Sequence, residues 1–250
     1  MDILWDILSI EECNSSNTYL GELLSQNPTI NEGFTIRTNF QSQGRGQRDN
    51  IWKSNKGDNL LISFLLKPGL PAKRQFLLNQ IVCLGICEYL IDHDIKGEIR
   101  IKWPNDIYVD DRKICGILIQ NMLQGVNIHN SIVGIGLNIN QKEFDQSIPN
   151  PTSLSLEKEN DYNLENEMIK LLDCINSSYQ ELFRVRKAKP QSMYRFLLYK
   201  LNEEQKFITE LGKEFVGIIK GVDDLGRLEV ESEGVKNYYN FSEIKFIIEK

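Results

Sequence analysis

The segment 98–120 constrains the fold of this 250-residue chain more than any other, because three β-strand signals follow one another around short polar turns. Alternating or continuous apolar residues predict strands over 98–103, 107–109 and 113–120. Asp110 and Asp111 predict the turn before the last strand. Polar side chains at strand ends can converge on a ligand, which is the position expected for Asn105, Asp106 and Lys113.

The same segment also has a purely structural interpretation. Trp103 and Pro104 could be a core aromatic followed by a strand terminator, and Lys113 could be a solvated charge. Hairpin tips commonly carry Asp, Asn and Lys, so the segment taken alone leaves both interpretations open.

A second polar segment, residues 38–52, carries two glycines and two arginines just before an apolar run over 59–66. Glycine lets backbone amides approach a phosphate closely, and arginine forks match pairs of phosphate oxygens, so the segment is typical of an anion-binding loop. It lacks the Gly-Lys-Ser/Thr of a Walker loop and the strand–helix context of a dinucleotide fingerprint. A flexible surface linker or an RNA contact remains the alternative for this loop taken alone.

Together, and in this order, these segments resemble the biotin–protein ligases, the enzymes that attach biotin to carrier proteins. The family pattern consists of a Ser-Thr-Asn-like triplet, Gln-x-x-Gly-Arg-Gly-Arg-Arg-Gly-x-x-Trp, Lys-Trp-Pro-Asn-Asp, Lys-x-x-Gly and Gly-x-Asn. This chain supplies Ser15-Ser16-Asn17, Gln41 with Gly44-Arg45-Gly46-Gln47-Arg48 and Trp52, Lys102 to Asp106, Lys113 with Gly116, and Gly136-Leu137-Asn138. Five ordered matches are far more specific than any one of them.

Two positions depart from the family pattern. Gln47 stands where the family usually has arginine, and Asp49 where it usually has glycine. These departures bear on how the phosphate of an adenylate is held, and Arg48 is the side chain placed to compensate.

The resemblance implies that the chain activates biotin with ATP to biotinyl-5′-adenylate and transfers biotin to a lysine of a biotin carboxyl carrier protein. It implies catalytic roles for Lys113, Arg45 and Asp106. Implied biotin-binding residues are Ser15, Ser16, Asn17, Gln41, Gly44, Arg45, Gly46, Gln47, Lys113 and Gly116. Implied ATP- or adenylate-binding residues are Arg45, Arg48, Trp52, Asn105, Lys113 and Asn138. ATP and biotin are then substrates, Mg²⁺ comes with ATP, and no protein ligand is assigned to the metal.

The resemblance also implies an α+β fold: a catalytic domain over 1–206, with helices on a mixed β-sheet like that of class II aminoacyl-tRNA synthetases, and a small SH3-like β-barrel over 207–250. Residue patterns independently predict further strands over 130–140 and in the runs after 211. Apolar periodicity and turn signals predict helices over 17–24, 71–90, 164–185 and 191–202. Ser15 or Ser16 is expected to cap the first helix. The glycines of 130–140 are typical either of sheet packing or of close approach by another backbone or a ligand.

Three other functions stay open at this stage. A lipoate or octanoate ligase shares the fold and the adenylate chemistry, although Gln41 and the two serines favour a ureido ring over a bare aliphatic chain. A sensor that binds biotin or a nucleotide without turnover would not need Lys113 or the 102–106 motif. A nucleic-acid contact is suggested only by the glycine–arginine loop, and the net charge of −6 disfavours it.

Composition indicates an ordinary packed protein, with 41% hydrophobic residues. Five cysteines without a Cys-x-x-Cys pair predict reduced thiols and a cytoplasmic location. Cys83 and Cys87 are expected in the core, and zinc is not expected because neither His93 nor His129 has ligand spacing to a cysteine. No apolar run approaches the ~20 residues of a membrane span. The resemblance begins so near residue 15 that we expect no DNA-binding domain before it; a homodimer through sheet edges is compatible with the sequence.

Overall fold

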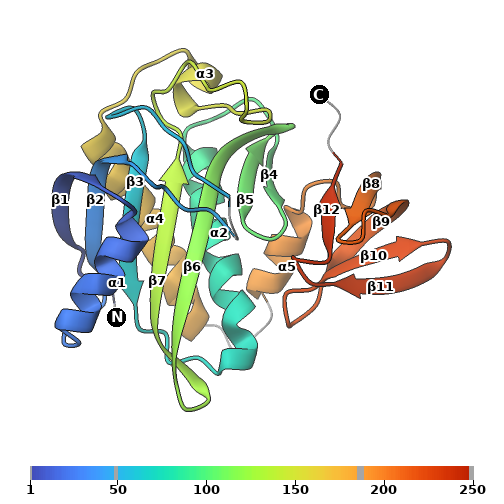
Figure 1. The fold of residues 1–250 in the computed structure, drawn as a ribbon, viewed down its shortest axis with the longest axis horizontal. Helices are drawn as coiled ribbons and strands as arrows, with labels where there is room; N and C mark the ends of the chain where they lie inside the picture. Colours follow the sequence, from blue (N-terminus) through green and yellow to red (C-terminus); the bar gives the residue numbers. More distant parts are fainter. Residues whose placement is uncertain (1, 48–49, 185–188, 248–250) are drawn as a thin grey trace.

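A computed structural model describes residues 2–47, 50–184 and 189–247. Two β-sheets form the framework, a larger one in the N-terminal part and a smaller one at the C-terminal end (Figure 1). The larger sheet contains β1 (Asp6–Cys13), β2 (Phe34–Gln41), β3 (Leu60–Leu66), β4 (Ile99–Lys102), β5 (Asp106–Val109), β6 (Arg112–Gln124) and β7 (Asn127–Leu137). Its order is β1-β2-β3-β7-β6-β5-β4, with only the β1–β2 pair parallel. The fold is therefore a mixed sheet with helices, as expected.

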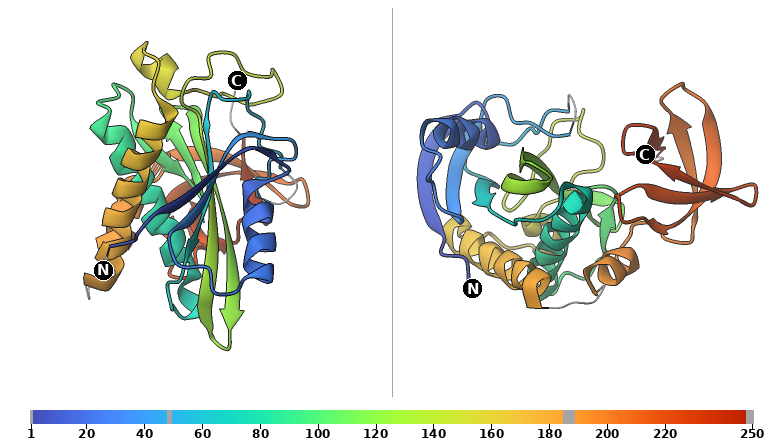
Figure 2. Two further views of the ribbon diagram at one scale, coloured as in Figure 1. Left: turned by 90° about the vertical axis from the view of Figure 1, so that its left-hand side faces the viewer. Right: turned by 90° about the horizontal axis from the view of Figure 1, so that it is seen from below.

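Helices cover both faces of the larger sheet (Figure 2). On one face lie α2 (Gln75–Asp92) and α4 (Leu164–Arg184), and on the other lies α1 (Ser16–Gln26). Strand β3 is buried along its whole length because it is covered on both sides: Ile62 and Phe64 belong to the main core, whereas Leu65 packs with α1. This double covering is why the strand reads as a continuous apolar run.

The predicted helices are confirmed except at two points. The helix predicted over 191–202 is wrong in its second half, because α5 (Lys189–Phe196) ends at Phe196. Beyond it, Leu198 bridges Ile101 of the large sheet and Leu201 bridges Ile219 of the small one, so the backbone here pairs with strands. Val185, the last residue of the predicted 164–185 helix, lies outside the described residues. Two short helical segments complete the set, the 3-10 turn Ala72–Arg74 before α2 and α3 (Leu154–Lys158).

The side-chain cap predicted for α1 is wrong. Ser15 occupies the N-cap position in an extended conformation, and its carbonyl accepts from Tyr19 N–H at 2.9 Å, but its hydroxyl makes no capping hydrogen bond. Ser16 is the first helical residue, and its hydroxyl donates a hydrogen bond to Gln41 Oε1 rather than capping the helix. Both serines are buried, so their side chains turn toward the interior of the protein.

The C-terminal sheet is antiparallel, in the order β11-β10-β9-β8-β12. Its strands are β8 (Glu204–Thr209), β9 (Glu214–Val222), β10 (Leu228–Ser232), β11 (Val235–Tyr239) and β12 (Ile244–Phe246). The small β-domain expected here is present; in the described part of the chain its strands pair in an open order with β11 and β12 at the ends. The boundary predicted between 206 and 207 lies inside β8, so the C-terminal sheet begins before it.

The cysteines expected in the core, Cys83 and Cys87, are both buried on α2. Within the described ranges, no helix combines the length and apolar character needed to cross a membrane.

Candidate active site

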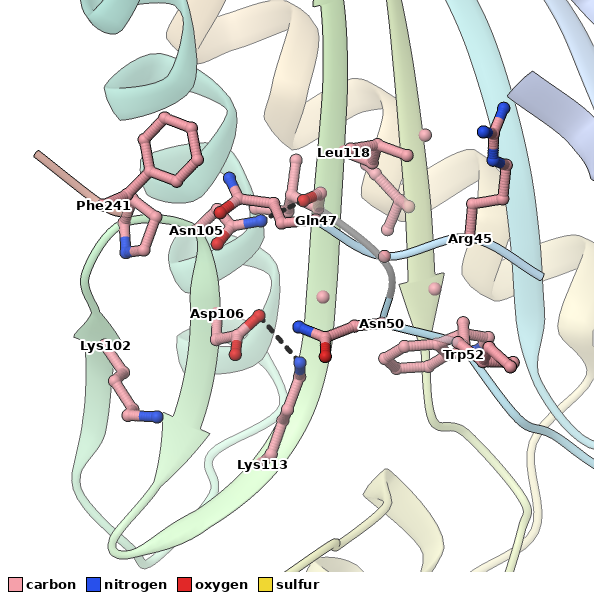
Figure 3. A pocket seen from close by; sticks show the side chains of 18 of the residues that line it. Arg45, Gln47, Asn50, Trp52, Lys102, Asn105, Asp106, Lys113, Leu118 and Phe241 are labelled. Atoms are coloured by element: carbon pink, nitrogen blue, oxygen red, sulfur yellow. Dashed lines mark hydrogen bonds and ion pairs between the residues drawn. The ribbon is translucent and has the colours of Figure 1, made fainter. Parts of the chain in front are cut away.

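A cavity of about 380 Å³ lies where the glycine–arginine loop, the β4–β6 hairpins and the C-terminal domain meet (Figure 3). Its walls come from the start of α1, from residues 45–47 and 50–52, from strands β4 to β7, and from Phe241 and residues 244–246. The segments that carry the sequence motifs therefore line one cavity, although more than a hundred residues separate the first from the last. Most of the implied site residues line it: Ser15, Ser16, Asn17, Gln41, Arg45, Gly46, Gln47, Trp52, Asn105, Asp106, Lys113 and Gly116.

Lys113 and Asp106 form an ion pair inside this cavity, with Lys113 Nζ 2.8 Å from Asp106 Oδ1. The pair arises because β5 and β6 are adjacent antiparallel strands, and a register shift between Ile107 and Tyr108 brings Lys113 opposite Tyr108. Lys113 Nζ also lies 5.6 Å from the centre of the Trp52 ring. The lysine is thus held between a carboxylate and an aromatic face.

Positive charge predominates around the cavity. Its described lining includes four cationic side chains and a single carboxylate, that of Asp106; the cations are Arg45, Lys102, Lys113 and Lys245. A pocket lined mainly by one sign of charge raises the local concentration of ligands of the opposite sign. The cavity therefore favours anionic ligands such as carboxylates and phosphates.

Lys102 is a charged side chain in largely apolar surroundings. Its Nζ lies 5.3 Å from the centre of the Tyr108 ring and 5.2 Å from that of Phe246, which belongs to the C-terminal domain. Burial lowers the pKa of Lys102 below its ordinary value, and the nearby Asp106 carboxylate opposes that shift. The C-terminal domain thus contributes to the environment of a lysine in the Lys-Trp-Pro-Asn-Asp motif.

The rest of that motif is anchored by hydrogen bonds to three parts of the structure. Trp103 Nε1 donates to the carbonyl of Gly226 in the C-terminal domain at 2.9 Å, and the hydroxyl of Tyr194 on α5 donates to the carbonyl of Pro104 at 2.9 Å. Asn105 Nδ2 donates to the carbonyl of Ile117, whose own N–H returns a bond to the Asn105 carbonyl at 3.2 Å. Trp103 is therefore a core aromatic, as the structural interpretation held, and it also joins the two domains.

A connected polar cluster forms the far end of the cavity. Gln41 Oε1 accepts from Ser16 N–H at 2.7 Å and from the Ser16 hydroxyl at 3.1 Å. Asn17 Nδ2 donates to the carbonyl of Leu118 at 3.2 Å and to Gln120 Oε1 at 3.1 Å. Polar groups connected by hydrogen bonds hold one geometry and suit a ligand with matching donors and acceptors.

Sequence reasoning missed Ser63, which joins this cluster from β3. Its Oγ lies 2.7 Å from Ser16 Oγ and 2.6 Å from Asn17 Oδ1. A signal was present, because Ser63 is the single polar residue in the otherwise apolar strand 60–66 and is fully buried.

The glycines of β7 are sites of close approach, but by side chains of the protein, whereas the sequence interpretation named a backbone or a ligand. A Cβ at Gly134 would lie 2.1 Å from Asn17 Oδ1, and one at Gly136 would lie 2.4 Å from Cε2 of Trp52. Each glycine therefore makes room for a side chain of the pocket rather than for another backbone.

Three implied site residues, Gly44, Asn138 and Arg48, do not line the cavity or cannot be placed. The carbonyl of Gly44 accepts a hydrogen bond from the backbone N–H of Trp52 at 2.9 Å. Asn138 is buried, and its Nδ2 donates to the carbonyl of Thr152, whose N–H in turn donates to the carbonyl of Lys113. That chain of bonds links Asn138 to the backbone of Lys113, and direct contact of Asn138 with an adenylate stays a prediction. Arg48 and Asp49 lie outside the described residues.

The C-terminal contribution to the cavity had no counterpart in the sequence reasoning. Phe241, Ile244, Lys245 and Phe246 all line it. These residues form part of a short strand and turn whose local pattern predicts only β structure. As for metal sites, the described residues contain no group of three His, Cys, Asp or Glu side chains arranged to hold an ion.

This arrangement defines a two-domain protein in which a small β-domain completes a cationic pocket on a mixed sheet. Residues 10–138 match the model of the biotin/lipoate A/B protein ligase family, and residues 200–246 match that of the biotin protein ligase C-terminal domain. The chain belongs to the biotin/lipoate A/B protein ligase family.

Two curated relatives are the bifunctional ligase/repressors BirA of Bacillus subtilis (strain 168) and Escherichia coli (strain K12). The first is 26% identical over 213 residues, covering 84% of this chain and 65% of the relative. The second is 29% identical over 228 residues, covering 89% of this chain and 68% of the relative. The chain thus spans about two thirds of the length of these relatives.

The fold is also that of a solved structure, a biotin protein ligase from Aquifex aeolicus in complex with biotin and ATP. The two chains superpose with a TM-score of 0.79 at 23% identity, over 98% of this chain and 99% of the other. The expected architecture of both domains is therefore confirmed.

Proposed function

We propose that this chain is a biotin–protein ligase, which activates biotin with ATP to biotinyl-5′-adenylate and then transfers biotin to a lysine of a carrier protein. The observation that carries the proposal is the Lys113–Asp106 pair in the same cavity as the Ser16–Gln41–Asn17 cluster. Membership of the family and the likeness to a ligase bound to biotin and ATP support it.

In the first step, a carboxylate oxygen of biotin attacks the α-phosphorus of ATP, and pyrophosphate leaves. Two anions must approach each other, so the main task of the protein is to position them and to offset their charge. Lys113 and Arg45 are the cations that we assign to this task. Mg²⁺ enters as the complex with ATP and supplies further positive charge.

In the second step, the amine of the carrier lysine attacks the acyl carbon of the adenylate, and AMP leaves. The attacking nitrogen must lose a proton. Asp106 is the one carboxylate among the described lining residues, so we assign it the role of accepting this proton. Lys113, 2.8 Å away, holds the carboxylate in place.

The neutral donors and acceptors of Ser15, Ser16, Asn17 and Gln41 suit the ureido ring of biotin, whereas the ring of lipoate would offer them no matching donor or acceptor. The partner that we propose is the biotin-accepting domain of a carboxylase, and the compartment is the cytoplasm, where the free thiols of all five cysteines persist. A homodimer through a sheet edge stays a prediction.

The test is to incubate the protein with magnesium-ATP and either biotin or lipoate, and to follow the acyl-adenylate by mass spectrometry together with pyrophosphate release. We expect biotinyl-adenylate from the wild type and a loss of at least ~10²-fold in its rate of formation in Lys113→Ala. Lys53→Ala, which removes an exposed lysine paired with Asp145 outside the cavity, is the matched control. Product with lipoate alone would assign the chain to the sister activity, and no adenylate with either acid would exclude the ligase.

A further inference from the structure

Two large apolar side chains stand exposed at the cavity. Ile51, at the end of the glycine–arginine loop, is 69% exposed, and Phe241, in the turn before β12, is 50% exposed. Both border the same cavity, although they come from different domains. Phe241 lies on the opposite side of the pocket from Trp52, the chain neighbour of Ile51 (Figure 3).

The backbone that carries each of these side chains is ordered by hydrogen bonds. Ile51 is bridged to Arg45 in an antiparallel pair. The turn that carries Phe241 is closed by Glu243, whose Oε2 accepts from Asn240 N–H at 2.7 Å and whose N–H donates to the Asn240 carbonyl at 2.9 Å. Pre-ordered apolar groups lose little conformational entropy when a partner covers them.

A small ligand inside the cavity does not account for this exposure, because a pocket of this size encloses most of a small ligand. A protein substrate does account for it. The carrier lysine must reach the Lys113–Asp106 pair from outside, and its side chain is short, so the carrier backbone on either side of it must lie across the mouth of the cavity. Aromatic residues such as Phe are enriched in the cores of protein interfaces, where charged residues are depleted.

We infer that Ile51 and Phe241 form an apolar rim that docks the carrier domain around its acceptor lysine. The inference rests on the proposed function. It adds the surface by which the enzyme would prefer a folded carrier domain to a small free amine as the acceptor of biotin. The catalytic and C-terminal domains each supply one side of this rim, so carrier recognition requires both.

The experiment separates the two half-reactions in Ile51→Ser and Phe241→Ser. Adenylate formation is measured as pyrophosphate release with biotin and magnesium-ATP alone. Transfer from preformed adenylate is then measured to a purified biotin-accepting carboxylase domain and, separately, to hydroxylamine. Leu211→Ser, at 96% exposed, and Val126→Ser, at 79% exposed, change apolar residues that are more exposed than the rim residues and do not border the cavity, one in each domain.

We expect the KM for the carrier domain to rise roughly tenfold in each rim variant, a larger change than any in adenylate formation or hydroxylamine consumption, and no effect in either control. A normal carrier KM in both rim variants would overturn the rim while leaving the ligase intact. A loss in adenylate formation or hydroxylamine consumption as large as the loss in carrier transfer would also overturn it, because the residues would then act on the small substrates. If the wild type forms no adenylate, it is the proposed function that fails.

Discussion

Asn17 fits against Gly134 so closely that a Cβ at the glycine would lie 2.1 Å from Asn17 Oδ1. The contact sets the position of the Asn17 amide, which donates to the carbonyl of Leu118 and to Gln120 Oε1. A glycine on β7 thereby determines the geometry of a polar cluster that begins on α1.

Gly134→Ala is expected to displace Asn17 and so to raise the KM for biotin roughly tenfold or more, since an imposed side-chain shift in a packed site costs ~1–3 kcal/mol. Adenylate formation at varied biotin concentration measures this. Gly21→Ala is the matched control, because its added Cβ meets Ile132 at 3.6 Å, an ordinary contact, and alanine favours the helix. An unchanged KM for biotin in Gly134→Ala would mean that Asn17 does not contact biotin.

Asp106→Asn tests the proton acceptor of the second step. Loss of a positioned base is expected to slow transfer from preformed adenylate to the carrier by ~10²-fold or more. Single-turnover transfer from preformed adenylate measures this rate separately from the first step. The two steps must be separated because the substitution also removes the ion-pair partner of Lys113, which lies 2.8 Å away. A normal transfer rate would remove Asp106 from the role of base.

Gln47 is expected to weaken retention of the adenylate, because a neutral amide lines the cavity where the family usually has arginine. Gln47→Arg should slow release of biotinyl-adenylate roughly tenfold, since charge-assisted bonds to phosphate are about twice as strong as neutral ones. Release is followed by trapping free adenylate in solution. Gln43→Arg adds the same charge to an exposed loop position outside the cavity lining, and equal release from the wild type and Gln47→Arg would show that Gln47 is harmless.

Lys102→Met tests whether Lys102 is kept for function rather than for stability. Burial lowers the pKa of Lys102 in the folded state. Below that pKa the ammonium group is charged in both states but is better solvated in the unfolded state, so its charge destabilises the folded protein. Removing the charge is therefore expected to leave the melting temperature at pH 7 unchanged or higher, while adenylate formation slows. The wild type should gain stability relative to Lys102→Met as the pH rises through the folded pKa toward the ordinary value for lysine. A lower melting temperature in Lys102→Met at pH 7, with normal activity, would contradict this prediction.

Local patterns predicted much of the fold because they report the immediate neighbours of each residue. Alternation identified β4, and continuous apolar runs identified β3 and α2. The helix predicted over 191–202 failed beyond Phe196 because Leu198 and Leu201 pair with strands far away in the chain, which no local pattern records. Tertiary pairing overrides helical propensity wherever it offers the backbone other partners.

The candidate site divides in the same way. By itself the sequence determined the family motifs, and with them the expectation that Lys113, Asp106, Gln41 and Ser16 serve one ligand; these residues do line one cavity. Only the tertiary structure decided that Asn138 lies behind the site, that Ser63 joins its polar end, and that Phe241 and Phe246 border it from the second domain. The reason is physical: a motif specifies side-chain chemistry and local geometry, whereas the cavity is enclosed by docking of segments up to two hundred residues apart, which depends on long-range packing of both sheets.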